Sequence, residues 1–265
     1  MKYALITGGA SGMGRATALH LSQNGYNVFS LDIKKQAEEI ENITQIIADV
    51  TNAESIKNAY EIIINITKSL DAVINFAGII MMNSLIEISE EDFVRIFNIN
   101  LFGAYRINKQ FFPLVKNGNG KIIITTSELA PNKILPFNAI YSISKKSLDA
   151  YAEGLRMELG LLNIPVITLR PGAVETPILD DSNKEMQALN DNTTLYKNTI
   201  TKFKHIVDRE QGGAIPPDKI AKLVLKILTK KNPRCIYAKN TSKKLKLLSA
   251  IPAKTQIKLL KMILK

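Results

Sequence analysis

A tyrosine and a lysine stand four residues apart in the helix-like sequence Tyr141-Ser142-Ile143-Ser144-Lys145. Residues at this spacing share one face of a helix. A neighbouring ammonium group favours the phenolate, so we expect the pKa of Tyr141 to lie below its usual value of about 10. A phenol tuned in this way can exchange a proton with a substrate oxygen. The pair therefore predicts acid–base chemistry on an alcohol or a carbonyl.

Spacing alone does not single this pair out, because Tyr105 and Lys109 repeat it. Position separates the two pairs. Tyr141 opens a helical segment that follows an apolar run ending near Ser127, whereas Tyr105 lies in the middle of a helical segment with no polar strand end before it. Position therefore favours Tyr141 and Lys145.

Three glycines, Gly8, Gly12 and Gly14, lie between the first apolar run and the first helical segment. Glycines there permit a tight turn and bring backbone N–H groups and the positive end of a helix against a pyrophosphate. The turn has no lysine at the P-loop position, which disfavours a nucleoside triphosphate. The pattern predicts a dinucleotide site.

Asp32 ends the second apolar run, 18 residues beyond Gly14. A carboxylate there can accept hydrogen bonds from the hydroxyls of the adenosine ribose, and it repels a 2′-phosphate. Lys34 and Lys35 follow closely and soften that repulsion. The sequence favours NAD over NADP.

These residues must be positioned by a sheet, and the chain alternates short apolar runs with helical segments. The runs are Tyr3–Thr7, Val28–Leu31, Ile46–Ala48, Ala72–Asn75, Lys121–Thr125, Val166–Leu169 and Arg234–Ala238. The main helical segments between them are Arg15–Asn24, Ala53–Lys68, Glu90–Phe112 and Tyr141–Asn163. Uninterrupted Val/Ile/Leu runs are typical of parallel strands buried on both faces. We expect one doubly wound, Rossmann-type parallel sheet with helices on both faces, over residues 1–238.

Composition excludes several other classes of protein. The chain has 265 residues and a mass of 29.4 kDa, with 46% hydrophobic and 22% charged residues, which fits a folded α/β domain. A single cysteine and two histidines give no disulfide framework and no zinc motif, so no metal site is predicted. No apolar run reaches about 18 residues, and no signal peptide precedes the first strand, so the expected location is the cytoplasm.

The net charge of +11 is concentrated at the C-terminus. Residues 239–265 hold eight lysines and no acidic residue, and we treat them as a basic amphipathic tail. A helix over 254–265 would place Ile257, Leu260 and Leu264 on one face and the lysines opposite. Two interpretations remain open: peripheral contact with an anionic membrane, or docking on the fold or on a partner subunit. No aromatic residue follows Tyr237, which argues against a specific nucleic-acid site.

The stretch from about 177 to 214 follows the sixth apolar run and contains no clear strand. We interpret it as a helical substrate lid. Its apolar side chains, together with Ile79–Met82 and Leu135–Phe137, indicate a lipophilic secondary alcohol or ketone with a steroid-like ring or an acyl chain. Packing of the helices on one another would explain many of these side chains equally well.

The chain resembles the short-chain dehydrogenases/reductases from Lys2 to about Ala238. Thr7-Gly8-x-x-x-Gly12-x-Gly14 is similar to the cofactor turn of that family, and Asn75-Phe76-Ala77-Gly78 is similar to its Asn-Asn-Ala-Gly stretch except at Phe76. The resemblance implies that these residues bind the cofactor: Gly8, Ser11, Gly12, Met13, Gly14, Asp32, Asp49, Val50, Asn75, Ala77, Gly78, Tyr141, Lys145, Pro171, Gly172 and Thr176.

The resemblance also implies catalytic roles for four side chains. Tyr141 would be the general base in oxidation and the general acid in reduction. Lys145 would lower the pKa of Tyr141 and hold the nicotinamide ribose, Ser127 would hydrogen-bond the substrate oxygen, and Asn100 would orient a proton relay. It implies a homodimer or homotetramer built through the helices after Glu90 and Tyr141.

The predicted function is an NAD(H)-dependent oxidoreductase that interconverts a lipophilic secondary alcohol and a ketone. One alternative is an NADP(H)-dependent 3-oxoacyl or carbonyl reductase. A dinucleotide-binding regulatory protein is a further alternative, disfavoured because it would need none of Ser127, Tyr141 and Lys145.

Overall fold

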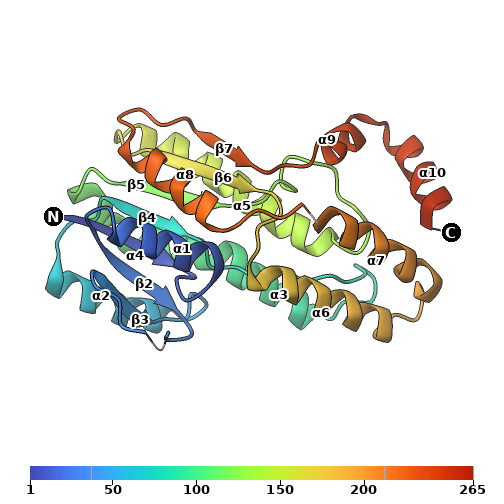
Figure 1. Cartoon of the computed structure of the whole chain (residues 1–265), viewed down its shortest axis with the longest axis horizontal. Coiled ribbons are helices and arrows are strands. Elements are labelled where there is room, and N and C mark those ends of the chain that lie inside the picture. The colour runs from blue at the N-terminus through green and yellow to red at the C-terminus, as the bar shows by residue number, and fades with distance from the viewer. Residues whose placement is uncertain (37, 212, 265) are drawn as a thin grey trace.

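A computed structural model describes residues 1–36, 38–211 and 213–264, with the side chains of 206–211 outside the description. Its centre is a seven-stranded parallel sheet in the order β3-β2-β1-β4-β5-β6-β7 (Figure 1). The strands are β1 (Lys2–Thr7), β2 (Tyr26–Asp32), β3 (Ile43–Ile47), β4 (Ala72–Asn75), β5 (Lys121–Thr125), β6 (Val166–Pro171) and β7 (Ile236–Lys239). The doubly wound parallel sheet predicted from the sequence is confirmed, with strand ends shifted by up to three residues.

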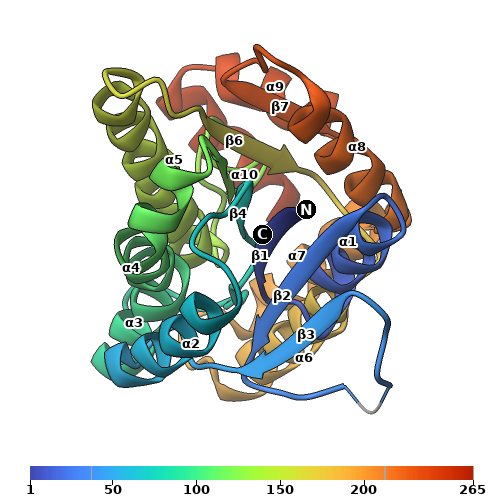
Figure 2. The same ribbon diagram turned by 90° about the vertical axis from the view of Figure 1, so that its left-hand side faces the viewer.

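Helices cover both faces of the sheet, as Figure 2 shows end-on. On one face lie α2 (Ala53–Ile66), α4 (Ala104–Asn117) and α5 (Ala139–Gly160), and on the other lie α1 (Gly12–Ser22) and α8 (Asp218–Thr229). Strand β1 shows why both faces are apolar, because Leu5 packs with the first set while Ala4 and Ile6 pack with the second. Alternation of side chains along a strand therefore builds two cores on one sheet.

The segment predicted as one helix over Glu90–Phe112 is divided into three pieces. It begins as α3 (Glu90–Phe97), widens into the π-helical segment η1 (Asn98–Gly103) and continues as α4. Single π-helical turns often occur at functional sites. Gly103 ends the segment against Val50, where an added Cβ would lie 2.7 Å from Val50 Cγ2. The apolar periodicity of the sequence did not reveal this interruption.

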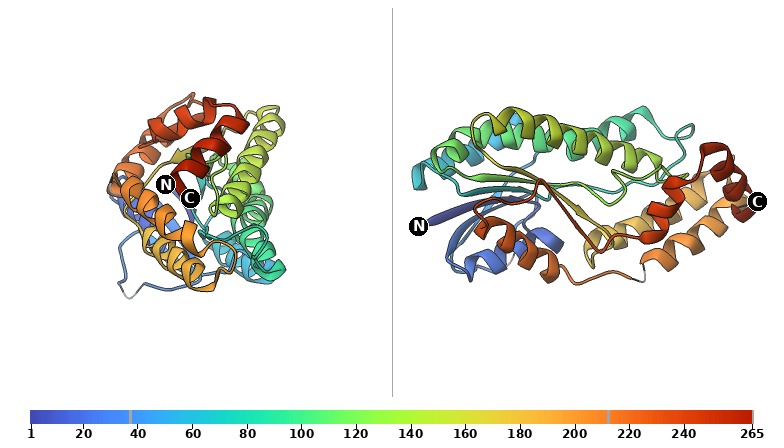
Figure 3. Two further views of the ribbon diagram at one scale, coloured as in Figure 1. Left: turned by 90° about the vertical axis from the view of Figure 1, so that its right-hand side faces the viewer. Right: turned by 90° about the horizontal axis from the view of Figure 1, so that it is seen from above.

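The remaining helices lie beyond the carboxyl ends of the strands (Figure 3). They are α6 (Pro177–Asn192), α7 (Lys197–Gln211), α9 (Lys243–Ala250) and α10 (Ala253–Leu264). Side chains of α6, α7 and α10 share one apolar cluster, which includes Met186, Phe203 and Leu264. The division of the chain near residue 238 stays a prediction. None of the helices described is long and apolar enough to cross a membrane.

Candidate functional site

Two adjoining cavities lie at the carboxyl ends of the strands, the edge at which ligands of open α/β sheets bind. The larger has a volume of about 740 Å³ and the smaller about 220 Å³. Both are lined by the same central residues, Met13, Phe76, Gly78, Ile79, Thr176 and Ile178. The two cavities therefore meet, and each holds a different part of the predicted chemistry.

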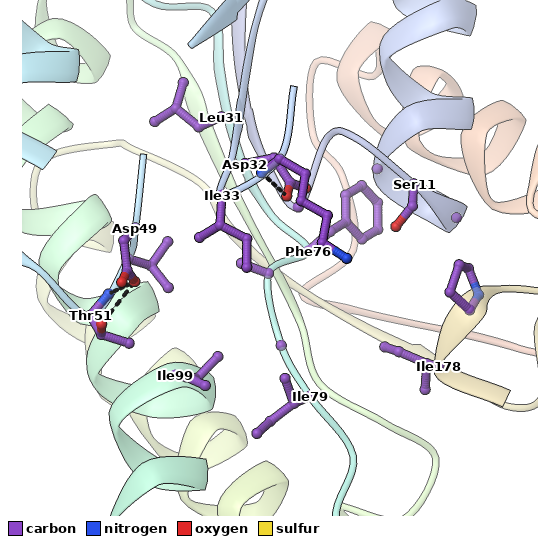
Figure 4. A pocket seen from close by; sticks show the side chains of 18 of the residues that line it. Ser11, Leu31, Asp32, Ile33, Asp49, Thr51, Phe76, Ile79, Ile99 and Ile178 are labelled. Carbon is purple, nitrogen blue, oxygen red and sulfur yellow. Dashed lines mark hydrogen bonds between the residues drawn. The ribbon is translucent and has the colours of Figure 1, made fainter. Parts of the chain in front are cut away.

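The glycine-rich turn forms one wall of the larger cavity (Figure 4). Gly8 has a φ of +70°, a conformation that favours glycine, and an added Cβ at Gly14 would lie 2.0 Å from the carbonyl oxygen of Gly8. Helix α1 begins within this turn, at Gly12, and the side chain of Ser11 makes no capping hydrogen bond to it. The first N–H groups of α1 are thus left for a ligand, which fits a pyrophosphate.

Asp32 is fixed at the end of β2 by two backbone N–H groups. Ala10 N donates to Oδ2 over 3.0 Å, and Lys34 N donates to Oδ1 over 3.1 Å. The carboxylate lies beside the glycine-rich turn in Figure 4 and lines the larger cavity. This placement fits a ribose whose hydroxyl groups donate to Asp32.

Asp49 and Val50 lie after β3 and line the same cavity. The Asp49 carboxylate accepts two hydrogen bonds from Thr51, one from its N–H and one from its hydroxyl, both over 2.8 Å. Thr51 thus fixes the orientation of the carboxylate. A fixed acceptor beside an aliphatic side chain suits the amino group and the ring of an adenine.

Ser127 and Tyr141 line the smaller cavity, together with Lys145. Ser127 lies just beyond β5 and Tyr141 in the first turn of α5, and both face the same cavity. Burial raises the pKa of Tyr141 to about 12; the neighbouring Ser127 hydroxyl opposes this shift and the charge of Glu128 adds to it. The pKa of Tyr141 is therefore raised, and not lowered as the neighbouring Lys145 led us to expect. The reason is that burying a phenolate costs more free energy than its neighbours return.

Lys145 is buried on the same face of α5 as Tyr141. Its ammonium donates to the carbonyl oxygen of Thr125 over 3.3 Å and lies 5.9 Å from the centre of the Tyr141 ring. Burial lowers the pKa of Lys145 to about 8. A group with this pKa is still mainly charged at pH 7, so the site holds a cation beneath the phenol.

Asn100 is completely buried in η1 and lines neither cavity. Its Nδ2 donates to Ile79 O and to Ser144 Oγ, each over 3.0 Å, and its Oδ1 accepts from Ile79 N over 2.8 Å. Asn100 therefore joins the loop after β4 to α5. An added Cβ at Gly78 would lie 3.1 Å from Asn100 Oδ1 and 3.3 Å from Lys145 Nζ. A glycine at this position therefore lets both side chains lie close to the loop after β4.

Other predicted cofactor residues divide between the cavities. Ser11, Gly12 and Ala77 line the larger, Pro171 and Gly172 line the smaller, and Met13, Gly78 and Thr176 line both.

Asn75 is not brought to the site. Its side chain is buried, lines neither cavity and donates to Asn108 Oδ1 over 2.9 Å and to Ile123 O over 3.3 Å. At the end of β4 the alternation of side chains turns Asn75 toward α4, whereas the next residue, Phe76, turns toward the cavities. A side-chain contact between Asn75 and the cofactor does not fit this placement.

Sequence reasoning missed several residues that line the site. Arg95 and Asp181 face the larger cavity from α3 and α6, and Leu245 of α9 lines the smaller one. Thr51 carried a local signal, because a Ser or Thr two residues after an Asp can cap its carboxylate. The others come from distant segments and left no such signal.

Comparison with known proteins agrees with this geometry. The family model described as short chain dehydrogenase matches residues 2–187. The chain is 30% identical over 230 residues to a 3-ketodihydrosphingosine reductase of Bacteroides thetaiotaomicron, covering 86% of this chain and 84% of that protein. It is 31% identical over 189 residues to a 3-oxoacyl-[acyl-carrier-protein] reductase of Thermotoga maritima, covering 68% and 76%.

Solved structures show the same fold. A 3-ketoacyl-(acyl-carrier-protein) reductase from Brucella melitensis, complexed with NADH, has a TM-score of 0.73 at 21% identity, with 89% of this chain and 96% of that chain covered. An alcohol dehydrogenase from Thermococcus sibiricus, complexed with 5-hydroxy-NADP, has a TM-score of 0.71 at 25% identity, with 90% and 96% covered. The chain therefore belongs to the short-chain dehydrogenase/reductase family and is an NAD(P)-dependent oxidoreductase.

Proposed function

We propose that the chain reduces a lipophilic ketone to a secondary alcohol with NADH and catalyses the reverse reaction with NAD. The observation that carries this proposal is the shared cavity wall of Ser127, Tyr141 and Lys145. Their cavity is otherwise mainly apolar and joins the cleft that contains the glycine-rich turn and Asp32.

A bound nicotinamide cofactor would supply or accept the hydride. The residues of this chain handle the proton and the developing charge. Ser127 donates a hydrogen bond to the substrate oxygen, where negative charge develops during reduction. Tyr141 donates its proton to the same oxygen, and in oxidation it takes that proton back. Lys145 contributes a buried positive charge below the phenol, and Asn100 acts as a positioning residue for the loop after β4 and for α5.

Tyr141 carries its proton in the ligand-free protein. With a pKa of about 12, the phenol is protonated at pH 7, which is the form that donates a proton during reduction. Oxidation requires the phenolate, which this buried site disfavours.

Three features support NAD as the cofactor. Asp32 is fixed by two backbone N–H groups beside the glycine-rich turn, where its negative charge would repel a 2′-phosphate. Arg15 lines neither cavity, and it is paired within the chain: its Nε donates to Gln36 Oε1 and its Nη2 to Glu38 Oε2, each over 3.1 Å. Ser11, rather than a basic residue, precedes the second glycine of the turn.

The apolar lining supports a long or bulky substrate. Ile80, Met82, Leu135, Leu179 and Phe203 all line the smaller cavity. A relative of this chain is named for reduction of 3-ketodihydrosphingosine, a ketone on a long alkyl chain. We propose a ketone of this lipid-like class.

The test is fluorescence-detected binding of NADH and NADPH to the wild type and to Asp32→Ala. We expect the wild type to bind NADH at least about tenfold more tightly than NADPH, a difference of about 1.4 kcal/mol, and the gap to shrink in the variant. Equal or tighter binding of NADPH by the wild type would contradict the assignment of Asp32.

One observation favours the alternative of an NADP(H)-dependent 3-oxoacyl or carbonyl reductase. Lys34 lines the larger cavity next to Asp32, and Lys35 follows it. Tighter binding of NADPH, lost in a Lys34→Gln/Lys35→Gln variant, would establish that alternative. A dinucleotide-binding regulator would bind either cofactor but show no turnover with any ketone.

The proposal includes a homodimer or homotetramer that acts in the cytoplasm. Apolar side chains remain exposed along η1, α4 and α5, among them Phe102, Tyr105 and Met157. Such exposure on adjacent helices supports contact between subunits.

A further inference from the structure

The basic tail folds back onto the catalytic end of the molecule instead of extending from it. Helices α9 and α10 lie beyond the carboxyl ends of the strands, and α10 contacts α7 (Figures 1 and 3). Leu264 of α10 is buried in the cluster that contains Ile200 and Phe203 of α7, and Leu260 packs against that cluster. The tail therefore has a fixed inner side.

The same two helices also expose apolar residues among lysines. Leu247 is 71% exposed, Met262 80%, Ile263 54% and Ile257 53%. The exposed lysines of these helices include Lys243, Lys246, Lys254, Lys258 and Lys261, and no acidic residue occurs anywhere from 239 to 265. We refer to this surface of α9 and α10 as the tail surface.

The tail surface adjoins the rim of the substrate cavity. Leu245 of α9 lines the smaller cavity with Ser127 and Tyr141. Just before α9, the N–H of Ser242 donates to Glu128 Oε2 over 2.5 Å, and Glu128 follows Ser127 directly in the chain. The position of the tail and the shape of the cavity are therefore linked.

We propose that the tail surface docks on a lipid bilayer that carries anionic lipids, and that the smaller cavity takes its substrate from that bilayer. Exposed apolar side chains among lysines, without acidic residues, match the boundary between acyl chains and anionic headgroups. This inference rests on the proposed function in one respect, the lipid-like ketone. The docking itself does not depend on the reaction.

Charge and side-chain composition argue against two other partners for the tail surface, a second copy of the chain and a nucleic acid. A second copy of the tail surface would set the lysines of α9 and α10 against the same lysines, with no acidic residue in either helix to offset their repulsion. A nucleic acid would match the charge but would leave the exposed aliphatic side chains without a partner, since the tail offers no aromatic ring for stacking. Both remain outcomes of the test.

The experiment is co-sedimentation of the full-length chain with lipid vesicles at about 0.1 M salt. One set of vesicles is pure phosphatidylcholine, and the other contains about 30% phosphatidylglycerol. We expect the anionic vesicles to bind the chain at least about tenfold more tightly, with the difference lost at about 0.5 M salt.

A triple variant, Lys254→Gln/Lys258→Gln/Lys261→Gln, should lower the affinity for anionic vesicles at least about tenfold, since each lysine near such a surface strengthens binding by about fivefold. Its matched control is Lys57→Gln/Lys116→Gln/Lys226→Gln, which removes the same charge from exposed positions on α2, α4 and α8. The control should bind like the wild type. A second tail variant, Met262→Ser/Ile263→Ser, should weaken binding without changing the net charge.

Activity separates this proposal from the proposed function. The tail triple variant should keep its kcat/KM for a short water-soluble ketone and lose rate on a long-chain ketone presented in anionic vesicles. Vesicle binding without turnover of any ketone would support the docking surface and contradict the proposed function. Equal binding to both vesicle types, equal losses in the two triple variants, or tighter binding to a DNA duplex than to anionic vesicles would overturn the docking proposal.

Discussion

Two tyrosine–lysine pairs of identical spacing provide a direct test of the catalytic assignment at the scale of single residues. Lys109 donates to the Tyr105 hydroxyl over 3.2 Å at the exposed surface, whereas Lys145 is buried, Tyr141 is half-buried, and both line the cavity of Ser127. The pair with the direct hydrogen bond is therefore not the pair in the cavity. What distinguishes Tyr141 is a low-dielectric site with a hydroxyl partner and space for a substrate.

We predict that Tyr141→Phe lowers kcat by at least about a thousandfold, because general acid–base catalysis contributes 10²–10⁴-fold and no other phenol lines the cavity as described. Tyr105→Phe is the matched control and should leave kcat unchanged. Steady-state kinetics and NADH binding measure both effects. A similar loss in the two variants would contradict the assignment.

Lys145 is expected to destabilise the ligand-free protein. Its pKa is about 8 in the folded state and 10.5 when unperturbed, so the penalty for charging it is present in full below about pH 8 and fades as pH rises to 10.5. Lys145→Met should therefore raise the free energy of unfolding at pH 7. The shift sets an upper limit of about 3 kcal/mol, reduced by loss of the hydrogen bond to Thr125.

Chemical denaturation between pH 6 and 10.5 measures this effect. The advantage of the variant should shrink above about pH 8, while its kcat falls strongly at every pH. A variant that is less stable than the wild type at pH 7 would show that packing and hydrogen bonding of Lys145 outweigh its desolvation.

At the scale of elements, a partly buried ion pair sets the position of α5 against the sheet. Asp149 of α5 accepts from Arg170 of β6 through both carboxylate oxygens, over 2.9 and 2.5 Å, and also from the hydroxyl of Thr126 over 3.0 Å. The side chains of Asp149 and Arg170 are 18% and 20% exposed. The pair ties α5 to the ends of β5 and β6, and so brings Tyr141 to Ser127.

Removing the carboxylate should therefore affect both stability and catalysis. We predict that Asp149→Ala lowers the free energy of unfolding by about 2 kcal/mol, because Arg170 is left partly buried without its partner. Urea denaturation measures the loss. The double variant Asp149→Ala/Arg170→Met should recover part of it, since no unpaired charge remains. Equal stability of the two variants would show that the unpaired charge of Arg170 is not the cause of the loss.

At the scale of the whole molecule, the exposed apolar surface predicts assembly. Met157 is 66% exposed and Leu161 at the end of α5 is 86% exposed. We predict that light scattering finds the wild type as a dimer or tetramer and that Met157→Glu/Leu161→Glu lowers its mass. Ile66→Glu, at an exposed position at the end of α2, is the control and should keep the wild-type mass. A monomeric wild type would contradict the prediction.

The sequence by itself determined the sheet, the glycine-rich turn and the position of Asp32. These features depend on local signals. Apolar runs mark strands buried on both faces, and the φ of +70° at Gly8 favours glycine, which can be read directly from the sequence. The same signals placed Ser127 and Tyr141 at one edge, because the carboxyl ends of parallel strands meet there.

Only the tertiary structure determined the burial, the pKa shifts and the side-chain contacts of those residues. Burial, which depends on segments far apart in the chain, reversed the expected direction of the Tyr141 pKa and turned Asn75 into the core. The π-helical turn at Asn100 and the place of Leu245 in the cavity likewise arise from contacts across the fold. Spacing along the chain determines which residues lie on the same face of a helix or strand. Desolvation and long-range packing depend on which other elements cover that face.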